Sequence, residues 1–127
     1  MKDSEHIEDF LDFIREAVRR YNMAVSDETL ADAQTQDILH QLELEENSYH
    51  EIARLGKLLK DVRARRRIAK DDKERLSLIA EWEEYNKAEI KSIERLLGGV
   101  RKMEQKQKNR IYAPRTDVLE KGTEVGA

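Results

Sequence analysis

The sequence predicts an all-α protein, a helical bundle built on a long antiparallel helix hairpin with a shorter N-terminal helical part. Apolar residues recur at spacings of three and four along most of the chain, no stretch alternates as a strand does, and the single proline, Pro114, lies near the C-terminal end. We therefore expect residues 1–117 to form one helical domain and residues 118–127 a flexible C-terminal tail.

The first part of the chain predicts two helices. An apolar stripe on a helix of about five turns is formed by Ile7, Phe10, Leu11, Ile14, Val18, Tyr21 and Val25. Ser26 and Asp27 interrupt this stripe and are residue types that favour helix N-caps. A second helix is therefore expected from about Glu28 to Glu46, with its apolar residues concentrated near its end.

The middle of the chain predicts a third helix. Asn47 and Ser48 break the pattern, and Ser48 with Glu51 three residues later has the spacing of a capping box. The stripe that follows consists of Ile52, Leu55, Leu59 and Val62. Asp71 and Asp72 are poor residues for a helix interior and good caps, so we expect a break there rather than a helix that runs through.

A fourth helix is expected after Asp72, and the polar residues 100–110 are expected to be a fraying extension of it. Its apolar residues are Leu76, Ile79, Ile90, Ile93, Leu97 and Val100. Gly98 and Gly99 weaken this helix and predict an end, a kink or a close helix contact. Pro114 then forbids further helix and favours an extended conformation at Ala113.

The composition excludes several functional classes. The net charge is −3 and both signs are mixed among the 40% of charged residues, so the whole protein is not a cationic surface for nucleic acid. The absence of cysteine excludes disulfides, cysteine-ligated zinc and a thiol nucleophile. The sequence has no apolar run near 18 residues and a polar N-terminus, so we expect no membrane span, no signal peptide and a cytoplasmic location.

The small apolar content predicts self-association. Apolar residues make up 39% and aromatic residues 6% of the chain, which gives one copy only a thin core. Long helices with thin cores usually bury their apolar faces against a partner chain. We therefore expect a homo-oligomer.

Polar residues occupy three positions where the stripes call for apolar ones. Arg66 continues the stripe of the third helix, and Glu83 and Asn86 interrupt that of the fourth. One interpretation is a buried polar layer that fixes the register of the helices. The other is that the seam between the helices opens at these positions around a polar ligand. In either case Arg66 is expected to be at least half buried and paired, because buried charges are costly when unpaired.

Two basic segments are candidate ligand sites. Arg63, Arg66, Arg67 and Lys70 share one helix face. Their charge is balanced either by acidic neighbours, namely Glu43, Glu45, Glu46, Asp61 and Glu83, or by the phosphate groups of a ligand.

The second basic segment lies around Pro114. Arg110, Tyr112 and Arg115 combine two guanidinium groups with an aromatic ring, and such groups hold phosphates and stack on bases. The alternative is that Ile111 and Tyr112 only fix the last helix to the bundle.

Signals for catalysis are weak. His40 and Glu43 lie three residues apart, but in the order opposite to that of di-iron bundles and without a second copy. The Glu-x-x-Glu spacings that begin at Glu43 and Glu81 are expected by chance in a chain so rich in glutamate. The sequence has no glycine-rich phosphate loop and no nucleophile elbow. We therefore expect no enzyme, metal or cofactor.

Three segments, TQDILHQLEL, SYHEIARLGKLLKDVRARRRIAKD and RIYAPR, carry a resemblance. They resemble small helical proteins encoded by phages and prophages of low-GC Gram-positive bacteria, over about Gln34 to Arg115. The shared elements map onto Asp37, Leu39, His40 and Glu43, then Arg63, Arg66, Arg67, Lys70 and Asp71, then Arg110, Tyr112, Pro114 and Arg115. The chain lacks the proline that begins the last long helix of that family, and the family carries no known activity. Because His40 is part of these shared elements, the resemblance implies that it is a further candidate ligand-binding residue.

The resemblance implies that the protein is encoded by a phage, and this origin suggests a biological function. Small phage proteins without catalytic motifs often block host components, and some sequester the nucleotide signals of bacterial immunity. We therefore expect a non-enzymatic counter-defence protein that sequesters an anionic, nucleotide-like ligand of the cyclic nucleotide or cyclic ADP-ribose type. The alternative is a helical interaction module that binds and inhibits a host protein. Nucleic acid is a less favoured partner.

Overall fold

The computed structural model describes residues 1–111, 113–114 and 118, and every regular element among them is a helix. The elements are α1 (Asp3–Leu44), α2 (Tyr49–Tyr85) and α3 (Lys87–Lys108). The predicted all-α class is confirmed. Tyr112, Arg115 and positions 119–127 of the predicted tail lie outside the described residues.

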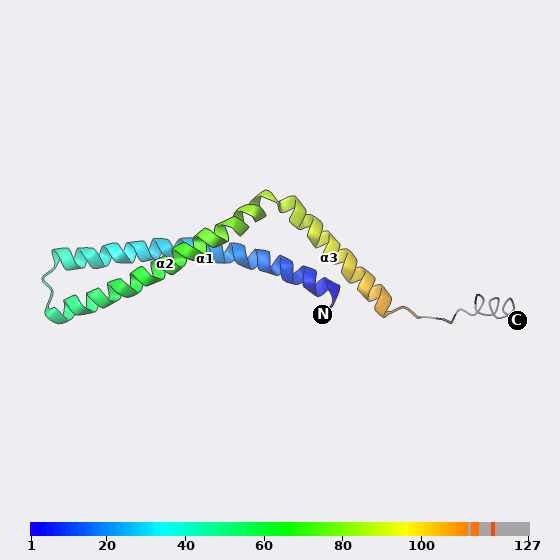
Figure 1. Cartoon of the computed structure of the whole chain (residues 1–127), viewed down its shortest axis with the longest axis horizontal. Helices are drawn as coiled ribbons and strands as arrows, with labels where there is room; N and C mark the ends of the chain where they lie inside the picture. Colours follow the sequence, from blue (N-terminus) through cyan, green and yellow to red (C-terminus); the bar gives the residue numbers. More distant parts are fainter. Residues whose placement is uncertain (112, 115–117, 119–127) are drawn as a thin grey trace.

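The helices form an elongated arrangement rather than a compact bundle. α2 returns along the second half of α1, and α3 bends away from the end of α2 and approaches the first half of α1 (Figure 1). α1 therefore packs against both other helices, while α2 and α3 touch each other little. The expectation of a shorter N-terminal helical part is wrong, since α1, with 42 residues, is the longest helix.

The seam between α1 and α2 follows a seven-residue repeat. The buried positions of α2 are Leu55, Val62, Ala69 and Leu76, and those of the matching row of α1 are Ala17, Ala24, Ala31 and Ile38. A strict repeat of seven keeps one row of side chains facing a partner helix along its whole length, as in coiled coils. The small alanine side chains allow the two backbones to lie close together.

Two predicted helix breaks are absent from the structure. α1 runs unbroken through Ser26 and Asp27, and α2 runs unbroken through Asp71 and Asp72. In an exposed helix interior serine and aspartate cost only a fraction of a kcal/mol each relative to good helix formers. The continuous α1–α2 seam outweighs that cost.

The connections between the three helices are made at two asparagines and one serine. Ser48 accepts a hydrogen bond from the backbone amide of Glu51 at 3.2 Å, so the predicted start of this helix is confirmed. Asn47 closes the preceding helix by donating from its side chain to the carbonyl oxygen of Gln41 at 3.0 Å. The break between α2 and α3 is at Asn86, whose backbone leaves the helical conformation (φ −122°, ψ 34°).

α3 docks on α1 in an antiparallel register. Leu97 is its one buried residue. Three polar contacts fix the register: Arg15 pairs with Glu94 at 3.1 Å, Arg101 pairs with Glu8 at 2.9 Å, and the Ser4 amide donates to Glu104 at 3.2 Å. Hydrogen bonds from Ser4, chiefly from its side chain, lower the pKa of Glu104.

The structure gives no packing reason for the glycine pair. α3 passes through Gly98 and Gly99 without a break, and no neighbouring atom lies within 4 Å of where a β-carbon would stand at either position. Neither glycine has a positive φ. The prediction of an end or kink at this pair is therefore wrong, and no close contact within the chain requires it.

Replacing Gly99 by alanine should therefore stabilise the protein. We expect Gly99→Ala to raise the free energy of unfolding by up to about 1 kcal/mol, the difference in helix propensity between the two residues. Urea unfolding followed by circular dichroism at 222 nm measures this change. Ala88→Gly, at an exposed position of the same helix, is the matched control and should lower the stability. A destabilised Gly99→Ala variant would show that another chain approaches the helix at this glycine.

Candidate functional site

A group of four charges interrupts the α1–α2 seam. The Glu28 carboxylate lies between two cations: Lys73 Nζ is 2.7 Å from Oε2, and Arg66 Nη2 is 3.7 Å from Oε1. Arg66 also donates from Nε to Asp32 Oδ1 at 2.6 Å. The Glu28 side chain is only 14% exposed, and its Oε2 atom, which faces Lys73 Nζ, is fully buried. Lys73 is therefore its counter-ion.

The cations of this group are held in their charged forms. The hydrogen bond with Asp32 raises the pKa of Arg66, and the hydrogen bond with Glu28 raises the pKa of Lys73. The Arg66 side chain is 24% exposed, so the prediction that it is at least half buried and paired with a carboxylate is confirmed. Its charge is balanced within the chain, which supports a layer that fixes helix register.

The other three members of the predicted basic face lie apart from Arg66. Arg63, Arg67 and Lys70 are exposed on the outer flank of α2 and form no ion pair with any residue that the structure describes. Lys60, three residues before Arg63, continues this flank. The acidic neighbours that the sequence suggested as partners therefore do not balance these charges, which are left to solvent or to an anionic ligand.

The remaining predicted site residues are not gathered around this flank. His40 is exposed on α1 and is not among the buried seam residues of that helix. Arg110 follows the end of α3, which contacts Ser4 at the start of α1, whereas Arg66 contacts Asp32. Since Ser4 and Asp32 are 28 residues apart on one helix, these two regions are separated by about 42 Å. Tyr112 and Arg115 lie outside the described residues.

A different site forms where α2 diverges from α1. A hollow of 360 Å³, which we call the aromatic notch, is lined only by apolar residues: Phe10, Ile14, Leu78, Ile79 and Trp82. Phe10 and Trp82 are 43% and 40% exposed, and Phe13, one helical turn from Phe10, is also exposed. Half-exposed aromatic side chains around an apolar hollow are typical of protein interaction sites.

The polar residues near the helix bend explain why the notch is open. The seam row of α2 would continue from Leu76 to Glu83, but Glu83 lines a small second hollow with Arg15 rather than a packed layer. Asn86 then ends the helix. The sequence left open whether Glu83 and Asn86 form a buried polar layer or mark an opening of the seam. In the structure Glu83 lines a hollow together with Arg15 and Glu94, while the adjacent notch is apolar. Phe10 had been assigned to the core stripe, and no pattern singled out Trp82.

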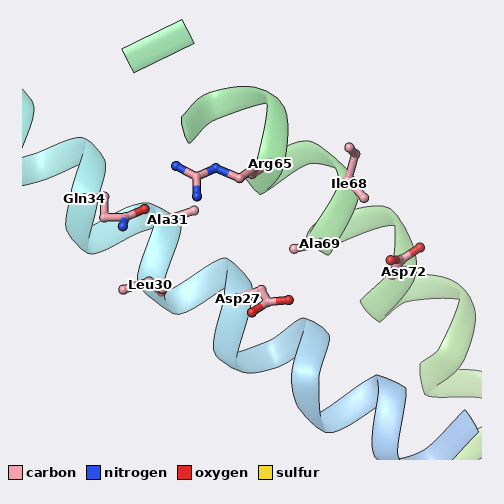
Figure 2. A pocket seen from close by; sticks show the side chains of 8 residues that line it. All are labelled: Asp27, Leu30, Ala31, Gln34, Arg65, Ile68, Ala69 and Asp72. Atoms are coloured by element: carbon pink, nitrogen blue, oxygen red, sulfur yellow. The ribbon is translucent and has the colours of Figure 1, made fainter. Parts of the chain in front are cut away.

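A third hollow, of 260 Å³, lies over the alanine layers of the seam. Ala31 and Ala69 leave space between the two helices, and Figure 2 shows Arg65 of α2 and Gln34 of α1 extending toward one another across it. Leu30, Ile68, Asp27 and Asp72 complete its rim. The rim combines both charge signs with exposed apolar side chains, as interaction surfaces do.

The described residues hold no cluster of histidine and acidic side chains with the geometry of a metal site. None of their helices is long and apolar enough to span a membrane. Comparisons of the chain with family models, with curated proteins and with solved structures found no match. The resemblance to phage proteins therefore stays an expectation.

The charged layer predicts a clear effect of one substitution. Arg66→Ala leaves the buried Glu28 with one counter-ion and Asp32 with none, so we expect a lower melting temperature. Arg67→Ala removes the same charge from the exposed flank and should leave the melting temperature almost unchanged. Thermal unfolding followed by circular dichroism compares the two variants. Equal melting temperatures would show that the layer does not stabilise the α1–α2 seam.

Proposed function

We propose that this protein is a non-enzymatic helical interaction module that binds a partner protein through the aromatic notch. In the phage setting that the resemblance implies, the partner is a host protein that the module inhibits. One observation carries the proposal: the apolar notch between Phe10 and Trp82 is the place where aromatic side chains are held half-exposed around a hollow. A hydrophobic side chain from a partner helix or loop would fill it.

The energetics of protein interfaces support this choice. A few aromatic residues at the centre of an interface carry most of its binding energy, and tryptophan is the most enriched of them. The helices that form the notch place these rings without any need for folding on binding, so little ordering entropy opposes the interaction.

We also propose that the protein acts as a homo-oligomer. Its accessible surface is 10337 Å² for a mass of 14.9 kDa. A compact monomer of this mass would expose roughly 7000 Å². Helices that are packed on one side only contribute to this excess, and association with another copy would bury part of their exposed surface.

A binding experiment tests the aromatic notch. The tagged protein, expressed in a low-GC Gram-positive host, should recover a host protein in near-stoichiometric amount, and calorimetry should then confirm direct binding between the purified partners. Trp82→Ala should weaken this binding at least about tenfold, since central aromatic residues contribute about 2 kcal/mol or more. Tyr85→Ala, on the same helix but outside the notch, is the control. Recovery of no host protein, or binding insensitive to Trp82, would exclude this function.

A second candidate function rests on the unpaired basic flank. Arg63, Arg67 and Lys70 have no ion pair with a described residue, and guanidinium groups suit phosphates. This supports the sequestration of a nucleotide-like ligand. A second wall from the region of Arg110 would have to come from a neighbouring copy, because the two regions of one chain are about 42 Å apart.

The basic flank can be tested directly with phosphate-bearing probes. Calorimetry with cyclic ADP-ribose and cyclic dinucleotides should detect binding that the triple variant Arg63→Gln, Arg67→Gln, Lys70→Gln abolishes. The control removes three exposed cations from α3: Lys91→Gln, Arg95→Gln and Lys102→Gln. If the unmutated protein binds neither probe, or if both triple variants lose binding equally, the flank is a solvated surface and this second function is excluded.

A further inference from the structure

One exposed strip of α2 has a self-complementary sequence. We define the α2 strip as the residues at alternating spacings of three and four that begin one turn inside the helix: Glu51, Arg54, Leu58, Asp61, Arg65, Ile68, Asp72 and Arg75. Such spacing places them along one side of the helix. Arg65, Ile68 and Asp72 line the 260 Å³ hollow over the alanine layers. Arg54 and Leu58 line a neighbouring hollow of 220 Å³, to which Arg65 also contributes. The strip therefore borders a groove along the hairpin.

The order of residues in the strip is symmetric about position 63. Asp61 and Arg65 are equidistant from it, as are Leu58 and Ile68. The same holds farther out for Arg54 with Asp72 and for Glu51 with Arg75. Each such pair joins opposite charges or two apolar side chains. An antiparallel copy of the strip, centred on the same position, would therefore place every residue opposite a complementary one.

We propose that the α2 strip pairs with the α2 strip of a second copy, with the two helices antiparallel about a two-fold axis near position 63. Such an isologous interface requires a surface that is complementary to itself. Antiparallel helices whose contact residues alternate at spacings of three and four bring facing positions together in the same way as a two-stranded coiled coil. The occupant of the groove is thus a second copy of this chain.

The contacts within one copy leave the centre of the strip available. Asp61 and Arg65 are exposed and form no ion pair with a described residue, and Ile68 is 63% exposed. At the two ends, Arg54 pairs with Glu51 at 3.0 Å and Arg75 pairs with Asp72 at 2.9 Å. In the dimer these end pairs face each other and form a group of four alternating charges, so no charge at the interface faces one of its own sign.

The available surface is sufficient for a stable dimer. The strip spans 25 residues of α2, from Glu51 to Arg75, a rise of about 36 Å. A standard interface buries about 800 Å² from each partner. The chain exposes over 3000 Å² more than a compact monomer of its mass, roughly 7000 Å². Leu30 of α1, which lies across the hollow from Ile68 (Figure 2), adds apolar surface that the second copy would cover.

Cross-linking distinguishes this arrangement from others, because the chain has no cysteine of its own. Leu58 faces Ile68 of the second copy, so a mixture of Leu58→Cys and Ile68→Cys proteins should form a mixed disulfide under mild oxidation. Each variant alone should not, since its two thiols would lie about 15 Å apart along the helices, too far for a disulfide. Disulfides within each single variant would indicate a parallel pairing and overturn the proposal.

Charge reversal provides a second test. Asp61→Arg places two pairs of like charges across the interface, so light scattering should show a dimer dissociation constant raised about tenfold. Adding Arg65→Asp exchanges the charges and should restore dimerisation. Asp71→Arg, an equal charge change outside the strip, is the control. A wild-type monomer at micromolar concentration, or equal effects of the two arginine substitutions, overturns the proposal.

This proposal does not depend on host binding at the aromatic notch, because Trp82 lies outside the strip. A strip dimer that binds no host protein would exclude only the proposed function. A monomer that binds a host protein through Trp82 would exclude the α2–α2 pairing and the proposed homo-oligomer, but not host binding at the notch.

Discussion

The charged layer at Glu28 fixes how the rest of the molecule is arranged. The α1–α2 seam repeats every seven residues and is built largely from alanines, so apolar packing alone would distinguish poorly between registers shifted by one repeat. Glu28 favours one register, because its buried carboxylate meets both Arg66 and Lys73 only there. In a helix shifted by one repeat, the carboxylate would keep one of these two cations, which are themselves seven residues apart, and would lose the other. The notch, the groove and the position of α3 all follow from this register.

The sequence predicted the helical class and the start of α2 well, because periodicity and the cap at Ser48 are local signals. It predicted the continuity of the helices poorly. Ser26 and Asp71 are residue types that favour helix caps, yet each lies in an exposed helix interior. The free-energy cost of their low helix propensity is smaller than the stabilisation from the α1–α2 seam. The core was also misjudged, since the predicted stripes consisted of large side chains, whereas Ala17, Ala24 and Ala31 form much of the contact. Alanine favours helices everywhere and gives no sign of burial.

The candidate site was predictable only in part. Arg66 was recognised from its place in the third-helix stripe, but it was also grouped with Arg63 and Arg67. One residue along a helix is a rotation of about 100°, enough to separate a seam cation from an exposed flank. The aromatic notch depends on where α2 leaves α1, which is a tertiary property that neither Phe10 nor Trp82 reveals locally. The symmetry of the α2 strip, by contrast, can be read from the sequence. Its residues lie on one side of a single helix only because α2 is continuous through Asp71 and Asp72.

The docking of α3 has a consequence for the dynamics of the chain. α3 follows a break at one residue, Asn86, and is held on α1 by one buried leucine and by polar contacts at exposed positions. Exposed ion pairs of this kind contribute at most about 1 kcal/mol each and are weakened by salt. Detachment of α3 therefore requires far less free energy than opening of the α1–α2 seam, so its amides are the first of the three helices to exchange with deuterium, and faster at higher salt. The first half of α1 would then be uncovered, including the residues beside the notch, which makes ionic strength a control on how much apolar surface the protein displays.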